Sequence, residues 1–363
     1  MITFSIAYWQ YYVLTWGILA CIILCFRNTG QLIKGWKFPF FGLLIMLLGW
    51  YYIGTRPIDK VGDSELYSTI YNLVAFNKWT DFKSTPSEWF WSSVEWSCLR
   101  AGITASGWFM VVAAFYFIGH AIAISRWLPR NFTFGVIFVV SVISFGAYSY
   151  NGLRQGMAAA LCLAGLSLLP VEDKRNIKML IIGGLLLFCG ASSHTSMIMF
   201  GLCAAVAYFC PGMRKAYVVW GVCLLLSPIA TSFSTQLGAL FISDGRFSTY
   251  SALEATTAYA NLGWRWDFII YSALPVLVAW YITERRRIED KTYMLIASTY
   301  LYANAGWLLV NSIAYSNRFA YISWCLYPFV LCYPLLRMRL CKKQGVLTAG
   351  TLALMLLLYM ILS

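Results

Sequence analysis

Long runs of apolar residues separated by short polar turns recur along the whole chain. Each run is about as long as a helix that crosses the lipid core, and lipid offers no partners to free backbone groups, so each run should be helical. The pattern predicts an all-α polytopic membrane protein with about 12 transmembrane helices, forming one domain over residues 1–363 with outer loops 55–100 and 233–265. The expected spans are residues 5–26, 38–54, 101–124, 132–149, 153–170, 178–192, 195–210, 216–232, 266–282, 292–310, 318–336 and 346–362.

The composition agrees with a membrane protein and narrows the chemistry. The chain is 60% hydrophobic and only 11% charged, whereas soluble domains carry about 25% charged residues. No charged segment with a cleavage site stands at the start, so no removable signal peptide is expected. The eleven cysteines lie almost all within apolar runs and lack metal-ligand spacing. We therefore expect no metal, no cofactor and no disulfide framework.

Lysine and arginine gather in six of the short turns, and this sets the orientation of the chain. The turns alternate correctly if all six face the cytoplasm, which places both termini outside. Together they hold 18 of the 27 basic residues and five acidic ones. The net charge of the six turns is therefore +13, the same as that of the whole chain. The basic balance therefore reflects membrane orientation and not a nucleic-acid surface. The six turns are residues 27–37, 125–131, 171–178, 211–215, 283–291 and 337–345.

The basic residues on the outer side are mostly arginines. A guanidinium stays charged when desolvated and binds phosphate through two N–H groups at once, so these arginines suggest an anionic ligand such as a lipid diphosphate. For Arg100, Arg246 and Arg265 a second interpretation stays open, namely pairing with carboxylates such as Asp59, Glu95, Asp244 or Asp267. The outer basic residues are Arg56, Lys60, Lys78, Lys83, Arg100, Arg154, Arg246, Arg265 and Arg318.

The turn at residues 149–157 joins two apolar runs that must fold back on each other as neighbouring helices. It leaves Arg154 and Gln155 at or just inside the edge of the apolar slab. A charge at that depth is costly and usually faces protein or a water-filled cavity. The alternative is an arginine that extends to the lipid headgroups.

The outer loop 55–100 brings carboxylates to the same side of the membrane. Gly62 breaks any helix before Asp63, so a helix is expected to begin at Ser64. Asp63 either caps this helix or, like Glu65, accepts a proton from a sugar hydroxyl near the arginines.

Two further outer turns carry polar residues that suit a site. His194 is expected at the outer edge, close in depth to Arg154, where it acts as a general base, binds phosphate or simply hydrogen-bonds the backbone. The turn at residues 311–321 carries Arg318 one helical turn before Tyr321.

Four outer motifs now stand in a fixed order along the chain. Taken together, with the span count and orientation, they resemble the EpsG-type family of Wzy-like polysaccharide polymerases. The resemblance covers nearly the full chain, is centred on residues 56–196 and leaves loop 233–265 unmatched. The motifs are Arg56 with Gly62, Asp63 and Tyr67; Leu153-Arg154-Gln155-Gly156-Met157-Ala158; His194 with Ser196; and Arg318 with Tyr321.

The resemblance implies an integral enzyme of the bacterial inner membrane whose active face is periplasmic. Such an enzyme joins repeat units carried on undecaprenyl pyrophosphate into an O-antigen, capsule or exopolysaccharide. It is similar to the lipid-dependent GT-C glycosyltransferases, of which not every member needs a metal. The implied partners are undecaprenyl-pyrophosphate-linked oligosaccharides and the lipid bilayer, with room for a chain-length regulator and a flippase, and no nucleic acid.

The residues suit this reaction on their own terms. Breaking a glycosyl–diphosphate bond develops negative charge on the leaving phosphate, which preorganised arginines stabilise. Arg154 is the first candidate for this task, followed by Arg318 and Arg56. The proton of the acceptor hydroxyl goes to Asp63 or His194.

Other polar residues take supporting roles, and other functions stay open. Glu65 is the reserve base, while Tyr67, Gln155 and Tyr321 are expected to orient substrate or an arginine. A flippase or transporter of lipid-linked oligosaccharide is the main alternative, but it predicts mid-membrane charges and internal repeats, which the sequence lacks. An O-antigen ligase is the second alternative, although ligases usually have a larger late outer loop than residues 233–265.

The charge pattern predicts the sidedness of the turns. Reporter fusions placed in loops 27–37 and 283–291 should read cytoplasmic, because these loops carry the surplus of lysine and arginine. A fusion in loop 55–100 is the control and should read outside. An outside reading at either basic loop would contradict the assigned orientation.

Overall fold

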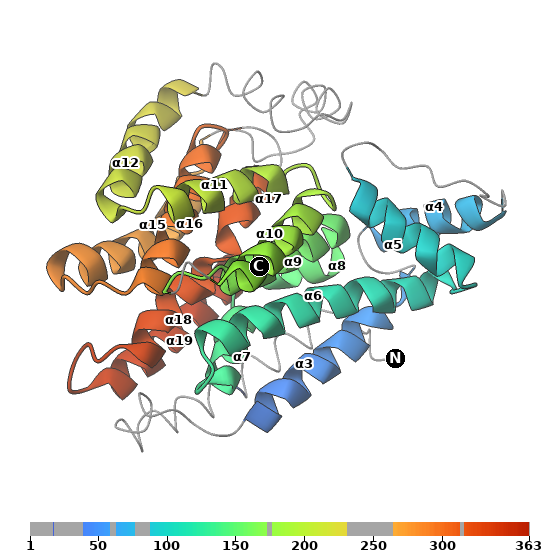
Figure 1. The fold of residues 1–363 in the computed structure, drawn as a ribbon, viewed down its shortest axis with the longest axis horizontal. Helices are drawn as coiled ribbons and strands as arrows, with labels where there is room; N and C mark the ends of the chain where they lie inside the picture. Colours follow the sequence, from blue (N-terminus) through green and yellow to red (C-terminus); the bar gives the residue numbers. More distant parts are fainter. Residues whose placement is uncertain are drawn as a thin grey trace. The chain divides into compact units, whose positions relative to one another are not determined.

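The computed structural model describes Gly17 and residues 39–58, 63–76, 88–172, 176–230, 264–312 and 316–362 (Figure 1). Within these residues every regular element is a helix, as the apolar runs predict. The chain divides into two compact units. The turn 27–37, the expected span 5–26 apart from Gly17, and nearly all of loop 233–265 lie outside the described residues.

The first unit holds residues 1–169, 176–194 and 332–363. Its long helix α6 packs against α9 on one side and α3 on another (Figure 1). The helices approach closely where the sequence has glycine: a side chain at Gly119 would place its Cβ 2.5 Å from the carbonyl oxygen of Ala160. The helices of this unit are α3 (Pro39–Gly54), α4 (Ser64–Phe76), α5 (Trp89–Arg100), α6 (Ala105–Trp127), α7 (Phe132–Val140), α8 (Ile143–Tyr150), α9 (Leu153–Leu168), α10 (Ile177–Ala191) and α19 (Gln344–Leu362).

The short helices α4 and α5 are attached to the first unit by aromatic side chains. Tyr71 of α4 stacks on Trp108 of α6 with 4.8 Å between ring centroids, and its hydroxyl donates to the carbonyl of Ile103. Trp91 of α5 meets the same Trp108 edge-on at 5.3 Å. Because these rings are buried, α4 and α5 are fixed on the helix core.

The expected single span 132–149 is wrong in one respect, because the structure breaks it into α7 and α8, which meet at 76°. The break has a local cause. The Ser141 hydroxyl donates to the carbonyl of Phe138, which closes α7, and Val142 then adopts an extended backbone. The redirected α8 leads into the turn that carries Arg154.

The second unit holds residues 170–175 and 195–331 and is organised around α16. The amide of Asn304, fully buried in α16, accepts a hydrogen bond from the Trp220 indole at 2.9 Å and donates to Ser323 at 3.0 Å. One side chain thus joins three helices. The elements are α11 (Met197–Phe209), α12 (Met213–Ala230), α15 (Trp266–Trp280), the π-helical turn η2 (Tyr281–Arg285), α16 (Lys291–Leu308) and α17 (Ser316–Trp324); α18 (Tyr327–Arg337) begins here and ends in the first unit.

Several of these helices are long and apolar enough to cross a membrane, so the chain is an integral membrane protein. Five stretches of the described residues meet this test, and a sixth does if the bent pair α7 and α8 counts as one span. Four shorter apolar helices accompany them. The five stretches are Ala105–Trp127, Met213–Ala230, Trp266–Arg285, Ser316–Arg337 and Gln344–Ile361.

The contact between α9 and α10 gives a test of the first unit. A Cβ at Gly183 would lie 2.8 Å from the carbonyl oxygen of Gly165, whereas a Cβ at the adjacent Gly184 would meet nothing within 4 Å. We expect Gly183→Ala to lower the thermal unfolding midpoint in detergent, at a cost of about 1–3 kcal/mol from overpacking. The matched control Gly184→Ala should be neutral or slightly stabilising, since alanine favours helix. Equal effects of the two changes would contradict this packing.

Candidate active site

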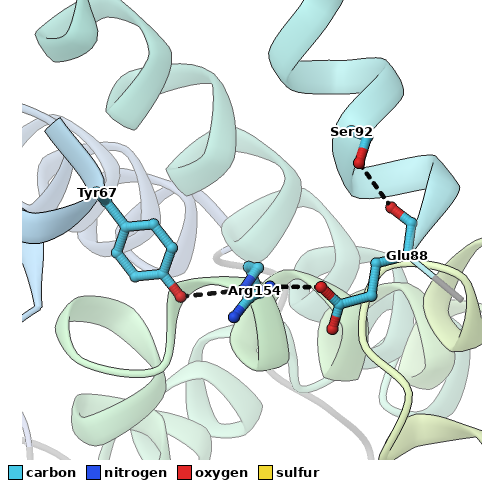
Figure 2. Close-up of polar contacts among 4 residues, drawn as sticks. All are labelled: Tyr67, Glu88, Ser92 and Arg154. Atoms are coloured by element: carbon cyan, nitrogen blue, oxygen red, sulfur yellow. Dashed lines mark hydrogen bonds and ion pairs between the residues drawn. The ribbon is translucent and has the colours of Figure 1, made fainter. Parts of the chain in front are cut away.

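Arg154 lies in the first turn of α9 and joins three elements that are far apart in the sequence. Its Nε donates to the hydroxyl of Tyr67 in α4 at 3.0 Å, and its Nη1 forms an ion pair with the carboxylate of Glu88. Figure 2 shows the guanidinium between these two side chains. The start of α9 is shaped by glycine, because a Cβ at Gly156 would lie 2.5 Å from the carbonyl oxygen of Tyr148.

The ion pair is largely shielded from solvent. The side chains of Arg154 and Glu88 are only 14% and 7% exposed, so each charge has lost most of its hydration and depends on the other. Glu88 is the N-cap residue of α5, yet its carboxylate makes no capping hydrogen bond. The carboxylate pairs with Arg154 and does not cap the helix. Arg154 therefore faces protein, and the alternative of extension to lipid headgroups does not describe it.

Arg56 is the second arginine of this unit, and it is buried more deeply. Its Nε donates to the Ser64 hydroxyl at 2.9 Å, and its Nη1 donates to the carbonyls of Ile53 and Ser149. The guanidinium lies 4.3 Å from the centre of the Phe109 ring. Burial lowers the pKa of Arg56 to about 10, which leaves it charged at neutral pH.

The first turn of α4 lies between the two arginines. Ser64 contacts Arg56, and Tyr67, one helical turn later, contacts Arg154. As predicted, α4 begins directly after Asp63, whose carbonyl accepts the first hydrogen bond from the Tyr67 N–H at 3.1 Å. Asp63 is half-buried, while Glu65 in the same turn is exposed.

The turn that carries His194 is tied to the beginning of α5. The N–H of Phe90 donates to the carbonyl of Ser192 at 3.0 Å, and the His194 N–H donates to Gly190 at 3.4 Å. Trp89 also contacts Phe188 with 5.7 Å between ring centroids. The end of α10 and the turn after it thus contact the two residues that follow Glu88. Gln155, beside Arg154 in α9, is buried.

A second carboxylate of α5, Glu95, is electrostatically coupled to this cluster. Its own burial raises its pKa, and the charge of Arg154 opposes that shift. Glu95 in turn raises the pKa values of Tyr71 and Cys98, adding to the larger effect of their own burial.

The remaining candidates belong to the second unit or have other partners. Arg318 is exposed near the start of α17, and the Tyr321 hydroxyl accepts from Asn317 at 3.2 Å. Arg265 forms a two-point ion pair with Asp267, which confirms the carboxylate interpretation for this arginine. Arg100 lies over the Trp96 ring at 5.5 Å. Arg246 lies outside the described residues.

Sequence reasoning did not select Glu88 as a site residue. The signal was available, because a glutamate directly before an aromatic helix occupies the N-cap position and can leave its carboxylate for another partner. Among the described residues, no three His, Cys, Asp or Glu side chains gather closely enough to hold a metal ion.

The comparison with protein families now decides the assignment. The model of the EpsG family matches residues 39–363, which is most of the chain. The chain belongs to the EpsG family. EpsG-type proteins are Wzy-like polymerases, so membership indicates a polysaccharide polymerase of glycosyltransferase type. No curated protein and no solved structure matches the chain significantly.

The ion pair between Arg154 and Glu88 of this EpsG-family protein gives a stability test. Glu88→Ala leaves the Arg154 charge buried without its counter-ion, so we expect a loss of about 3–5 kcal/mol and a lower thermal midpoint. Replacing both residues by methionine should recover much of that loss. Glu65→Ala is the control, since Glu65 is exposed in the nearby α4. A Glu88→Ala protein as stable as the control would show that the pair contributes nothing.

Proposed function

We propose that this protein polymerises oligosaccharide repeat units carried on undecaprenyl pyrophosphate, at the periplasmic face of the bacterial inner membrane. The observation that supports this most directly is the desolvated Arg154, held by Tyr67 and Glu88 where α4, α5 and α9 meet. In the reaction, the growing chain leaves its lipid diphosphate and is transferred to a hydroxyl of the incoming unit. The product is an O-antigen, capsule or exopolysaccharide.

Arg154 is proposed to bind the leaving diphosphate. The glycosyl–oxygen bond breaks with its electron pair moving to the diphosphate, and a guanidinium already fixed by two partners stabilises that charge without reorganising. Arg318, exposed in α17, is the second proposed diphosphate ligand. We assign Arg56 a supporting task, because its hydrogen bonds hold both the turn before Arg154 and the start of α4.

The other residues are proposed to orient the substrate and to move its proton. Tyr67 and Gln155 fix or flank Arg154, and Tyr321 orients substrate near Arg318. Asp63 and His194 are the candidate bases from sequence, with Glu65 in reserve. A base must be deprotonated to act, so transfer should require a pH above the pKa of whichever group serves.

The proposal includes the finer architecture. We place twelve spans in the membrane, with a GT-C-like organisation, both termini outside and no metal in the reaction. The proposed ligands and partners are the lipid-linked oligosaccharides, the bilayer, a chain-length regulator and a flippase. A flippase or ligase function remains the alternative, and the experiment below separates the three.

Deleting the gene and separating the surface polysaccharide on a gel distinguishes these functions. A ladder that collapses to one repeat indicates a polymerase. Loss of all material, with lipid-linked units trapped inside, indicates a flippase, and long polymer that stays on its lipid indicates a ligase.

Variants of Arg154 test its assigned role. Arg154→Ala, expressed in the deletion strain, should abolish long polymer while single repeats still reach the surface, and Arg154→Lys should restore it only weakly because lysine lacks the two-point fork. Arg339→Ala, which removes an exposed arginine of the basic turn 337–345, is the control and should give the full ladder. Normal chain length with Arg154→Ala would refute the catalytic role.

A further inference from the structure

Glu95 is a carboxylate on a largely buried face of α5, where a charged group is unfavourable. Trp91, four residues before it, and Cys98, three residues after it, are each only 5% exposed, so Glu95 lies on the face of α5 that packs into the core. A half-buried carboxylate on such a face loses hydration. The charge of Arg154 offsets only part of this cost, since the pKa of Glu95 is still raised. Residues held at such a cost are often functional.

The groups around Glu95 connect it to the proposed reaction. Trp91 and Cys98, which flank Glu95 on this face, share one buried cluster with Leu153 and Met157 of α9, the neighbours of Arg154. The charge of Arg154 accordingly acts on Glu95 and lowers its pKa against the effect of burial. Glu88 is the N-cap residue of the same helix. The helix α5 and its N-cap thus bring two carboxylates toward Arg154: Glu88 in direct contact, and Glu95 further along.

A single displacement needs a base that stands apart from the leaving group. The acceptor attacks the anomeric carbon from the side opposite the leaving group, so the base stands several ångströms from the leaving phosphate. Glu88, which is bound to Arg154, marks the leaving-group end. Glu95 lies about two helical turns further along α5 and is assigned to the acceptor end.

We propose that Glu95 is the residue that takes the proton from the acceptor hydroxyl, and that Glu88 holds Arg154 for the leaving diphosphate. This inference rests on the proposed polymerase function and selects a base other than Asp63 or His194. The acceptor O–H proton moves to the Glu95 carboxylate as the oxygen forms its bond to the anomeric carbon. The bond from that carbon to the diphosphate breaks, and its electron pair stays on the diphosphate beside Arg154. Glu95 then returns the proton to water.

The environment of Glu95 supports this role. Burial raises the pKa of Glu95, which strengthens the carboxylate as a proton acceptor. The charge of Arg154 limits this rise and so favours the deprotonated form that a base needs. Glu88 is less suitable, because its charge is already engaged by the guanidinium.

The test measures chain extension by the full-length protein in lipid vesicles. The probe is the lipid-linked single repeat extracted from the gene-deletion strain. Glu95→Gln should lower the rate at least about 100-fold, the usual contribution of a positioned base. The wild-type rate should fall as the pH drops below the raised pKa of Glu95, and the residual rate of Glu95→Gln should lack this acidic limb. Glu95→Asp should keep the limb at a reduced rate.

Stability and a matched control separate catalysis from folding. Glu95→Gln removes a poorly compensated buried charge, so its thermal midpoint should equal or exceed the wild-type value. Glu289→Gln, an exposed glutamate of the basic turn 283–291, should leave both rate and midpoint unchanged. A rate within threefold of wild type in Glu95→Gln, an unchanged acidic limb, or a midpoint lowered by more than a few degrees would each overturn the proposal.

Failure of this inference is distinguishable from failure of the polymerase function. If Arg154→Ala abolishes extension of the probe while Glu95→Gln extends it normally, the polymerase function stands and the base is another residue. If the wild-type protein does not extend the probe, the function itself is wrong.

Discussion

The pair formed by Arg154 and Glu88 is the interaction on which the arrangement of the first unit depends. Glu88 lies 66 residues before Arg154, and Tyr67 lies 87 residues before it, so one guanidinium fixes two loop-borne helices against α9. Burying such a pair is expensive, and an apolar trio of similar volume would often be as stable or more so. What the charges provide is a specific geometry, since a planar guanidinium donates its hydrogen bonds only in fixed directions.

The same interaction explains how α4 and α5 become part of a helical core. On its own α4 is short and α5 is mixed in polarity, so neither helix would be stable alone. Aromatic packing on Trp108 supplies the apolar attachment, and Arg154 supplies the polar one. Arg56 adds a third connection, from the end of α3 to the start of α4. The helices α4 and α5 therefore support polar groups near the end of α8 and the start of α9.

Helix positions followed closely from the sequence, but the polar contacts did not. The expected span 153–170 corresponds to α9 at Leu153–Leu168, and the expected start at Ser64 is observed, because apolar runs and helix breakers act locally. The break between α7 and α8 was missed, since hydropathy does not register a serine whose hydroxyl donates to the carbonyl three residues earlier. Glu88 was missed for a different reason: its partner is set by how distant segments pack, and periodicity carries no information about that.

The charged groups around Arg154 in the first unit influence one another. Arg154 carries one positive charge and has two carboxylates in its surroundings, Glu88 in contact and Glu95 further along α5. Without substrate, the cluster as a whole is not strongly attractive to an anion. In the proposed reaction, a diphosphate that binds the guanidinium while Glu88 still holds it adds negative potential, which raises the proton affinity of both carboxylates. A carboxylate here would therefore become a stronger base when the diphosphate arrives. The proposal thus links donor binding and proton removal through the field of a single arginine.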